Sequence, residues 1–168
     1  MERVSKENYY LDIAQTVIER ATGLRRCYGA IIVKNDEIIS TGYNGAPRGR
    51  KNCVDMGYCT REAMKVPRGQ RYELCRSVHA EANAIISAAR RDMVGGTLYL
   101  VGKDAATGTL LGDATSCSMC RRLIINAGLE KVVIRTSPTE YQVVRVQDWV
   151  EEDDSLPDRE LSGDPDCC

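Results

Sequence analysis

One histidine and two cysteines carry the strongest chemical signal in this sequence. His79 opens a His-Ala-Glu triplet, and Cys117 and Cys120 are separated only by Ser-Met. Zinc takes nitrogen and sulfur donors in a tetrahedron, and two cysteines three positions apart at a helix start can both reach one ion. A helix N-terminus also favours thiolates over thiols. The spacing therefore predicts a zinc ion held by His79, Cys117 and Cys120.

Three protein ligands leave a fourth position of the ion for water, which is typical of catalytic rather than structural zinc. Zinc lowers the pKa of such a water to roughly 7, so that it can attack a ring carbon bearing an amine. Glu81 follows His79 by two residues and is placed to carry protons from the water to the ring and then to ammonia. A His-x-Glu followed by Cys-x-x-Cys is a known signature of zinc-dependent base deaminases. The expected reaction is a hydrolytic deamination.

The first 76 residues predict a helix, a hairpin and a long loop. Ser5 is a suitable cap for a helix with one apolar face from Tyr10 to Ala21, ending at Gly23. Two apolar runs around Asn35-Asp36 then predict a β-hairpin. Its strands are residues 28–34 and 37–42. Residues 43–76 are polar and rich in turn formers, and a loop of this length in a compact domain usually carries function.

Helices and strands alternate in the rest of the chain. The predicted helices are 78–91, capped by Ser77, 117–127, capped by Ser116 and ended by Gly128, and a short one holding Trp149. The residues expected to face the core are Ala82, Ile85, Ile86 and Ala89 in the first of these and Leu123, Ile124 and Ala127 in the second. The predicted strands are 97–101, 131–135 and 141–146, and 102–115 form a loop or small hairpin. This order predicts an α/β fold, a central mixed five-stranded sheet with helices on both faces in three α/β/α layers.

Composition and charge narrow the class of protein. The chain has 168 residues, of which 43% are hydrophobic, which suits one domain over residues 1–150. Residues 151–168 hold eight acidic residues and one basic residue, and we expect a disordered tail there. The first 150 residues then carry a net charge of +6. Such a body favours an anionic small molecule, whereas nucleic acid is not an expected partner because no strongly basic stripe is visible.

Location follows from what the sequence lacks. It has no apolar run long enough to cross a membrane and no secretory signal pattern in its first 30 residues. We therefore expect a cytoplasmic location and no membrane partner. In a reducing compartment, the eight cysteines favour metal ligation over disulfides.

Several segments resemble the cytidine and deoxycytidylate deaminase superfamily over roughly residues 5–150. They are Gly29-Ala30, S-T-G-Y-N-G-A-P at 40–47, H-A-E-A-N-A-I at 79–85, T-L-Y-L at 97–100 and C-S-M-C at 117–120. The resemblance is strongest to deoxycytidylate (dCMP) deaminases. It implies a cytidine-deaminase-like fold, a homo-oligomer from dimer to hexamer, and conversion of dCMP to dUMP with release of ammonia, which supplies dUMP for dTMP synthesis.

The resemblance also implies roles for single residues. It assigns His79, Cys117 and Cys120 to zinc and Glu81 to proton transfer. It places the amide of Asn44 beside the nucleoside, and it places the Ala80 N–H and the Ser116 carbonyl at the pyrimidine ring. The alternative for Asn44 is a simple turn residue, because Asn-Gly favours turns. Some relatives bind dCTP and dTTP near the G-Y-N-G loop, so a Mg²⁺-nucleotide regulator is left open.

Two further binding sites are expected on weaker signals. The 5′-phosphate needs cationic donors, and Arg26 is the first choice, with Arg48 and Arg90 as others. The alternative for each is a solvated surface arginine. Cys53, Cys59 and Cys75 resemble the ligands of a second, structural zinc in some relatives, with Cys27 as a fourth. The alternative is thiols without a metal.

The sequence departs from the family pattern at two places. Ser116 stands where a proline usually precedes the first zinc cysteine, and residues 101–116 are longer than the usual connection. The insertion lies near the expected site and bears on substrate choice. Two rival hypotheses therefore accompany dCMP deamination. One is the same chemistry on another cytosine nucleoside, nucleotide or nucleic acid, and the other is a non-enzymatic, zinc-stabilised interaction domain.

Overall fold

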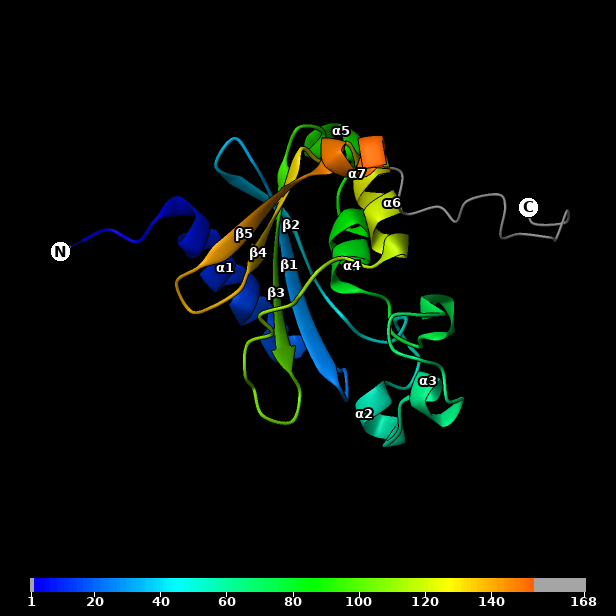
Figure 1. Cartoon of the computed structure of the whole chain (residues 1–168). Helices are drawn as coiled ribbons and strands as arrows, with labels where there is room; N and C mark the ends of the chain where they lie inside the picture. Colours follow the sequence, from blue (N-terminus) through cyan, green and yellow to red (C-terminus); the bar gives the residue numbers. More distant parts are fainter. Residues whose placement is uncertain (1, 153–168) are drawn as a thin grey trace, which may run out of the picture.

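The computed structural model of the chain describes residues 2–152 (Figure 1). The part of the expected acidic tail beyond residue 152 lies outside these residues. Among the described residues, five strands form one mixed sheet in the order β2-β1-β3-β4-β5. The strands are β1 (Arg26–Lys34), β2 (Glu37–Tyr43), β3 (Thr97–Asp104), β4 (Lys131–Arg135) and β5 (Tyr141–Arg145).

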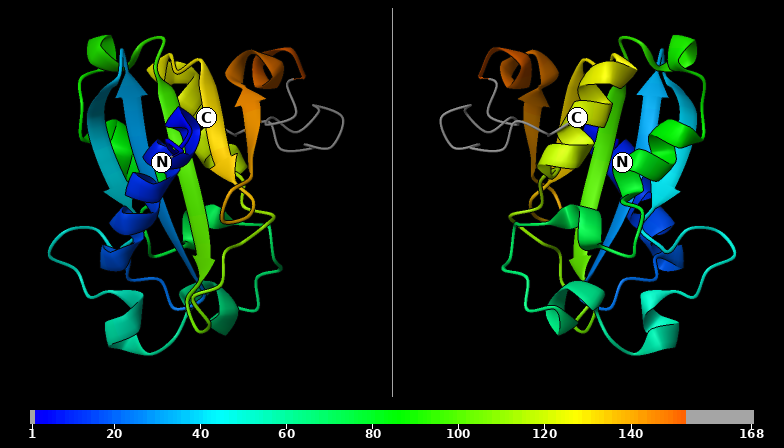
Figure 2. Two further views of the ribbon diagram at one scale, coloured as in Figure 1. Left: turned by 90° about the vertical axis from the view of Figure 1, so that its left-hand side faces the viewer. Right: turned by 90° about the vertical axis from the view of Figure 1, so that its right-hand side faces the viewer.

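Helices cover both faces of this sheet, which confirms the three-layer prediction. The helix α1 (Lys6–Val17) crosses one face, and α4 (Ala80–Ile86) and α6 (Ser118–Ala127) cross the other (Figure 2). The shorter elements are η1 (Ile18–Arg20), α2 (Cys53–Met56), α3 (Thr60–Ala63), η2 (Tyr72–Leu74), α5 (Arg90–Met93) and α7 (Val146–Glu152). No helix within residues 2–152 is long and apolar enough to cross a membrane.

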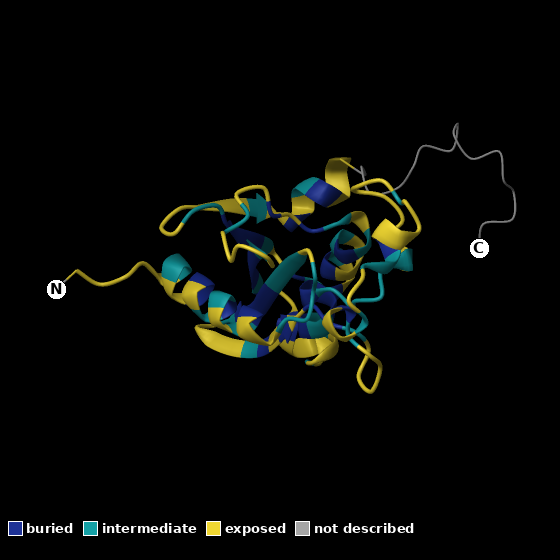
Figure 3. Cartoon of the chain, turned by 90° about the horizontal axis from the view of Figure 1, so that it is seen from below, coloured by how far each residue is buried: buried dark blue, intermediate teal, exposed yellow. Residues whose placement is uncertain are grey.

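Two clusters of buried side chains hold the layers together. Successive residues of a strand point to opposite faces, so Ile31 packs in the cluster under α1 and Ile32 in the cluster under α4 and α6. Burial is concentrated in the sheet and in the inward sides of the helices (Figure 3). Trp149 of α7 belongs to the second cluster, which ties the end of the described chain to α6.

The pairing of the strands determines where the helices begin. The strand β1 is antiparallel to both β2 and β3, with Gly29 opposite Tyr43 and Arg26 opposite Asp104. Consequently the last residues of β2 and β3 lie beside the first residues of β1, at one end of the sheet. The chain leaves the sheet at this end twice and returns as α4 and as α6, so the two helix N-termini converge there.

The predicted strands and hairpin are confirmed, and the turn residues Asn35 and Asp36 have the positive φ angles, 51° and 62°, that a tight hairpin needs. The boundaries of the predicted helix 78–91 are wrong. The helix α4 ends at Ile86, where the Ser87 hydroxyl donates to the Asn83 carbonyl at 2.7 Å. Such side-chain bonds compete with the helical pattern.

The predicted cap Ser5 is confirmed, since its hydroxyl accepts from the Asn8 N–H at 3.2 Å, but the other two predicted caps and part of the predicted buried faces are wrong. His79 is the N-cap of α4 and Cys117 the N-cap of α6, in place of Ser77 and Ser116. Ile86, Ala89 and Leu123 were expected inside, but Ile86 and Leu123 are 75% and 43% exposed and Ala89 is exposed beyond the end of α4. The residues of α4 that are buried are Ala80, Glu81, Ala82 and Ala84.

Gly42 allows β2 and α4 to approach closely. A Cβ atom on Gly42 would lie 2.3 Å from the Ala80 carbonyl oxygen and 2.4 Å from the Ala84 nitrogen. Both are backbone atoms and cannot rotate away. We expect Gly42→Ala to lower the free energy of unfolding by about 2–3 kcal/mol, measured by urea denaturation, and to weaken zinc binding because α4 begins beside His79.

Gly112→Ala is the matched control for this substitution. A Cβ on Gly112 would make only an ordinary contact, 3.5 Å from the Thr136 carbonyl, so a change within about 0.5 kcal/mol is expected. Equal stability of Gly42→Ala and the unsubstituted protein would contradict the close packing of α4 on β2.

Candidate metal centre and active site

His79 is held where β2 meets α4. Gly45, just beyond the end of β2, and Val78 exchange two backbone hydrogen bonds, of 3.1 and 2.7 Å. The side chain of Asn83 donates to the Tyr43 carbonyl at 2.8 Å. These contacts bring the two ends of residues 45–78 together beside the end of β2 and thereby position the backbone at His79.

The two cysteines are held at the start of α6. Cys117 caps the helix and Cys120 lies in its first turn. The Arg121 Nε donates to the Ser116 carbonyl at 3.1 Å, and its guanidinium lies 5.1 Å from the centre of the Trp149 ring. Arg121 therefore fixes the turn that a proline would otherwise make rigid at position 116.

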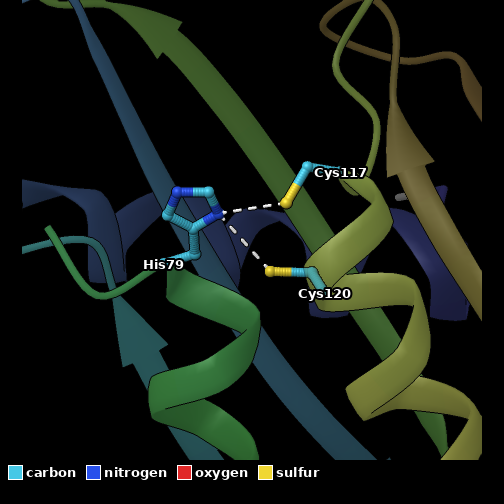
Figure 4. Close-up of side chains that lie close together, drawn as sticks. All are labelled: His79, Cys117 and Cys120. Carbon is cyan, nitrogen blue, oxygen red and sulfur yellow. Dashed lines mark hydrogen bonds between the residues drawn. The ribbon is translucent and has the colours of Figure 1, made fainter. Parts of the chain in front are cut away.

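His79 Nδ1 lies 3.4 Å from the sulfurs of both Cys117 and Cys120 (Figure 4). All three donor atoms lie within 4.8 Å of one another. Zinc–nitrogen and zinc–sulfur bonds of tetrahedral geometry separate their N and S atoms by about 3.5 Å. The observed spacing thus fits one zinc ion, and among the described residues this is the only group of three or more histidine, cysteine or acidic side chains at such spacing.

The two thiols form a coupled pair. A hydrogen bond from Cys120 lowers the pKa of Cys117 to about 4, against the effect of burial and with a smaller contribution from His79. The same interaction, together with burial, raises the pKa of Cys120. Because zinc binds thiolates and neutral imidazole, binding of the metal would release the protons that these three side chains hold.

A cavity of about 150 Å³ opens beside this cluster. His79, Cys117 and Glu81 line one part of it. Glu81 is only 4% exposed, and burial raises the pKa of its carboxyl group. A raised pKa makes a carboxylate a stronger proton acceptor. The cavity therefore joins a metal-ligand set of three residues to a group suited to proton transfer.

Four arginines give the cavity a positive wall. They are Arg25, Arg26, Arg61 and Arg68. The structure thus brings the predicted Arg26 to the cavity, whereas neither Arg48 nor Arg90 is among its lining residues. A phosphate contact by either of those two stays a prediction, and in the structure Arg90 donates to the Asn126 carbonyl at 2.7 Å.

Asn44 lines the cavity but is also part of the scaffold. Its side-chain nitrogen donates to the Arg26 carbonyl at 3.0 Å, and its oxygen accepts from the Tyr28 N–H at 2.7 Å. An amide side chain has two N–H groups and two acceptor sites, so one of each remains for a ligand. Asn44 is more than a turn residue, because it fixes the start of β1 beside Arg26.

Ala80 and Ser116 are buried and follow or precede lining residues, but neither lines the cavity. The Ser116 carbonyl already accepts the bond from Arg121. Contacts between these two backbone groups and a pyrimidine ring stay predictions.

Cys53, Cys59 and Cys75 line the same cavity and do not form a second close cluster of ligands within residues 2–152. The proposed fourth ligand, Cys27, donates to the Gly23 carbonyl at 3.5 Å. Cys75 instead hydrogen-bonds His79. A second zinc at these residues stays a prediction.

Sequence reasoning missed the aromatic and cationic residues that the long loop brings to the site. The Tyr72 ring lies 5.6 Å from the His79 ring in an edge-to-face arrangement, and the Arg61 guanidinium lies 4.3 Å from the centre of Tyr72. Tyr28 and Arg68 also line the cavity. No spacing rule identifies Arg61, Arg68 and Tyr72, because their positions depend on how residues 45–78 fold back over the sheet, whereas Tyr28 lies on β1.

A family model described as "Cytidine and deoxycytidylate deaminase zinc-binding region" matches residues 4–136. The chain therefore belongs to the cytidine and deoxycytidylate deaminase family, whose members bind zinc in this region. The structural fit of one zinc ion between α4 and α6 agrees with this membership.

Relatives with assigned names point within the family to deoxycytidylate deaminases. The enzyme of that name from Mycobacterium phage D29 is 35% identical over 138 residues, which cover 79% of this chain and 96% of the relative. The one from Schizosaccharomyces pombe is 33% identical over 135 residues, 80% of this chain. The chain spans only 38% of the length of the yeast protein.

Solved structures agree with the fold. A dCMP deaminase from the cyanophage S-TIM5, in complex with dCMP and dUMP, has a TM-score of 0.51 and 21% identity, covering 80% of this chain and 84% of that one. A cytidine deaminase from Burkholderia pseudomallei has a TM-score of 0.55 and 20% identity, covering 92% and 98%. Both similarities confirm the cytidine-deaminase-like arrangement of sheet and helices.

The ligand set can be tested by metal content. We expect Cys117→Ser and Cys120→Ser each to lose one zinc equivalent per chain, because a neutral hydroxyl replaces a thiolate ligand. Mass spectrometry of dialysed, zinc-loaded protein measures the loss. Ser118→Ala, an exposed position in the same turn of α6, is the control and should keep its zinc. Full zinc content in Cys117→Ser would contradict the assignment.

The same measurement tests the second zinc. If Cys53, Cys59 and Cys75 hold a structural ion, the unsubstituted protein contains two zinc ions per chain and Cys59→Ser contains one. One zinc per chain in fully loaded protein would exclude the second site.

Proposed function

We propose that this chain is a zinc-dependent deaminase that converts dCMP and water into dUMP and ammonia. His79, Cys117 and Cys120 hold the zinc ion, and Glu81 transfers the protons. The observation that carries the proposal is the three-donor cluster beside the buried carboxyl group of Glu81 in one cavity. The 35% identity to the phage D29 deoxycytidylate deaminase, over nearly the whole length of that protein, supports dCMP as the substrate.

The metal ligands and Glu81 have different roles in the proposed reaction. When bound, zinc supplies the Lewis acidity that activates a water molecule as a nucleophile at neutral pH. Glu81 accepts a proton from this water and delivers it to the ring nitrogen next to the reacting carbon. It then carries the second proton to the amino group, which leaves as ammonia. Because the carboxyl group is buried, it exchanges protons with the substrate rather than with bulk solvent.

The positive wall of the cavity suits the 5′-phosphate of dCMP. Arg26 lies at the start of β1, directly beside Asn44, and is partly buried, with a side chain 32% exposed. Its guanidinium can bind phosphate oxygens through two parallel N–H groups. Arg26 therefore remains the first choice for the phosphate, and Arg68 joins it as a second lining cation.

Three further proposals concern the oligomeric state, the location and the regulation of the whole protein. A homo-oligomer is supported by the exposure of Ile86 on α4 and Leu123 on α6, 75% and 43%. A cytoplasmic location is supported by the six unpaired cysteines within residues 2–152. Regulation by a Mg²⁺-nucleotide rests on the family resemblance alone.

Glu81→Gln tests the proton transfer. The amide keeps the size of the side chain but cannot accept a proton, so kcat for dCMP should fall by about 10²–10⁴-fold. Zinc content and unfolding midpoint should stay close to those of the unsubstituted protein. Retained turnover would reject Glu81 as the proton carrier, whereas absence of turnover in the unsubstituted, zinc-loaded protein would favour the rival hypothesis of a zinc-stabilised interaction domain.

A substrate panel tests dCMP itself. Ammonia release from cytosine, deoxycytidine, dCMP, dCTP and single-stranded DNA should be fastest, by kcat/KM, for dCMP. Arg26→Ala should raise the KM for dCMP about tenfold or more, because a charge-assisted hydrogen bond is lost, and should leave deoxycytidine nearly unchanged. Release from another substrate with none from dCMP would overturn the proposal.

A further inference from the structure

The insertion at residues 101–116 places one acidic side chain against the positive wall of the cavity. Asp113 Oδ2 lies 2.9 Å from Arg68 Nη2 and 4.0 Å from Arg26 Nη2. Asp113 itself does not line the cavity, whereas both arginines do. A single carboxylate oxygen thus bridges two cations that come from β1 and from the long loop.

The two arginines are brought together by separate parts of the scaffold. Arg26 begins β1 and its carbonyl accepts from Asn44. Arg68 lies in a turn in which the Gln70 N–H donates to the Pro67 carbonyl at 3.3 Å and Gly69 has a φ of 84°, as type II turns require.

The buried Arg61 holds this turn closed by donating to the carbonyls of Pro67 and Gln70, at 3.1 and 2.6 Å. The guanidinium of Arg61 is therefore engaged, and Arg25 is paired with Glu62 at 2.9 Å. Arg26 and Arg68 are the two lining arginines that share one acidic partner.

Asp113 is supplied by a segment with fixed ends. Before it, the Leu111 N–H donates to the Gly102 carbonyl at 2.9 Å, and the Leu111 side chain packs against the core under α4 and α6. After it, Ala114 is 6% exposed and Ser116 1% exposed. The backbone on both sides of Asp113 is therefore anchored, while its side chain is 66% exposed and free to turn away.

We propose that Asp113 is a specificity-determining latch: it bridges Arg26 and Arg68 at the rim of the cavity until the phosphate group of a nucleotide monophosphate displaces it. The inference rests on the proposed function, because it takes the phosphate ester as part of the substrate. A phosphate carries more negative charge and more acceptor oxygens than a carboxylate, so it is the better partner for two guanidinium groups. A nucleoside without phosphate leaves the latch closed.

Because both ion pairs of Asp113 are exposed, removal of its carboxylate should change nucleotide binding only modestly. Exposed pairs are weak and are easily displaced in water, so the latch selects against weak anions without blocking a phosphate. Removing the competing carboxylate should strengthen binding of a nucleotide monophosphate by about 2–5-fold. Binding of the matching nucleoside should not change, because it does not need the two arginines.

The experiment compares dUMP with deoxyuridine as binding probes, by isothermal titration of zinc-loaded protein. For Asp113→Asn the dissociation constant of dUMP should fall about 2–5-fold, and that of deoxyuridine should stay the same. Asp113→Ser should behave likewise, which guards against an effect of the asparagine itself. In an Arg68→Ala background, the gain from Asp113→Asn should shrink.

Asp36→Asn is the matched control. Asp36 has the same side-chain exposure as Asp113, 66%, and is also paired with a basic residue, Lys6. It lies past the far end of β1, roughly 25 Å from Arg26 along the strand, and asparagine tolerates the positive φ found there. Both dissociation constants should be unchanged in this variant.

Unchanged or weaker dUMP binding in Asp113→Asn would overturn the latch, as would an equal gain for deoxyuridine. Absence of dUMP binding in every variant would overturn it too. Turnover of dCMP by the unsubstituted protein is measured separately and tests the proposed function alone. Turnover without an effect of Asp113 rejects only the latch, and an effect of Asp113 on dUMP without turnover rejects only the proposed reaction.

Discussion

One geometric constraint governs this molecule. A nitrogen atom at the start of one helix and two sulfur atoms at the start of another must lie at the spacing of ligands around one tetrahedral zinc ion. The three atoms lie within 4.8 Å although 38 residues separate His79 from Cys117. The sheet makes this feasible, because β2 and β3 both run antiparallel to β1. The strand pairing therefore brings the ends of β2 and β3, and hence the starts of α4 and α6, to one end of the sheet without any contact specific to the metal.

The other side chains that line the cavity from regular elements also lie at this end of the sheet. β1 begins there, so Arg26 and Tyr28 enter the cavity from the sheet, and Asn44 connects them to the end of β2 through two hydrogen bonds. Glu81 comes with the first turn of α4. Regular helices and strands therefore place the three metal donors, Glu81 and Asn44, while the two long connections supply further lining residues of the cavity, such as Tyr72 and Thr115.

Sequence patterns predicted most of the fold because hydrophobic periodicity and turn residues are local. The hairpin at Asn35-Asp36 and the stop at Gly128 are such signals, and both are confirmed. The bounds of the short helix α4 were harder to predict, because its start follows the distant pairing of Val78 with Gly45 and its end lies where Ser87 bonds back to Asn83. Likewise Leu123 fits an apolar stripe by spacing alone, but the rotation of α6 that exposes it is decided by tertiary packing.

The residues of the candidate site likewise fall into two groups, those that local sequence patterns predict and those that only the tertiary fold places. The donor set and Glu81 were predictable because the chemistry demands particular residue types at short spacing. Arg68 and Tyr72 were not, since they reach the cavity only through the folding of a polar loop whose own turns carry little periodicity. Arg48 and Arg90 do not line the cavity, because a cationic residue near a motif in sequence need not lie near it in space.

The pair of backbone hydrogen bonds between Gly45 and Val78 has a consequence for the history of this fold. It turns the intervening segment into a closed appendage whose two ends meet at one point. The entropic cost of closing such a loop grows only slowly with its length. Evolution can therefore lengthen, shorten or rewrite this appendage, and thereby remodel the entrance to the cavity, while the ion-binding centre beneath it stays in register.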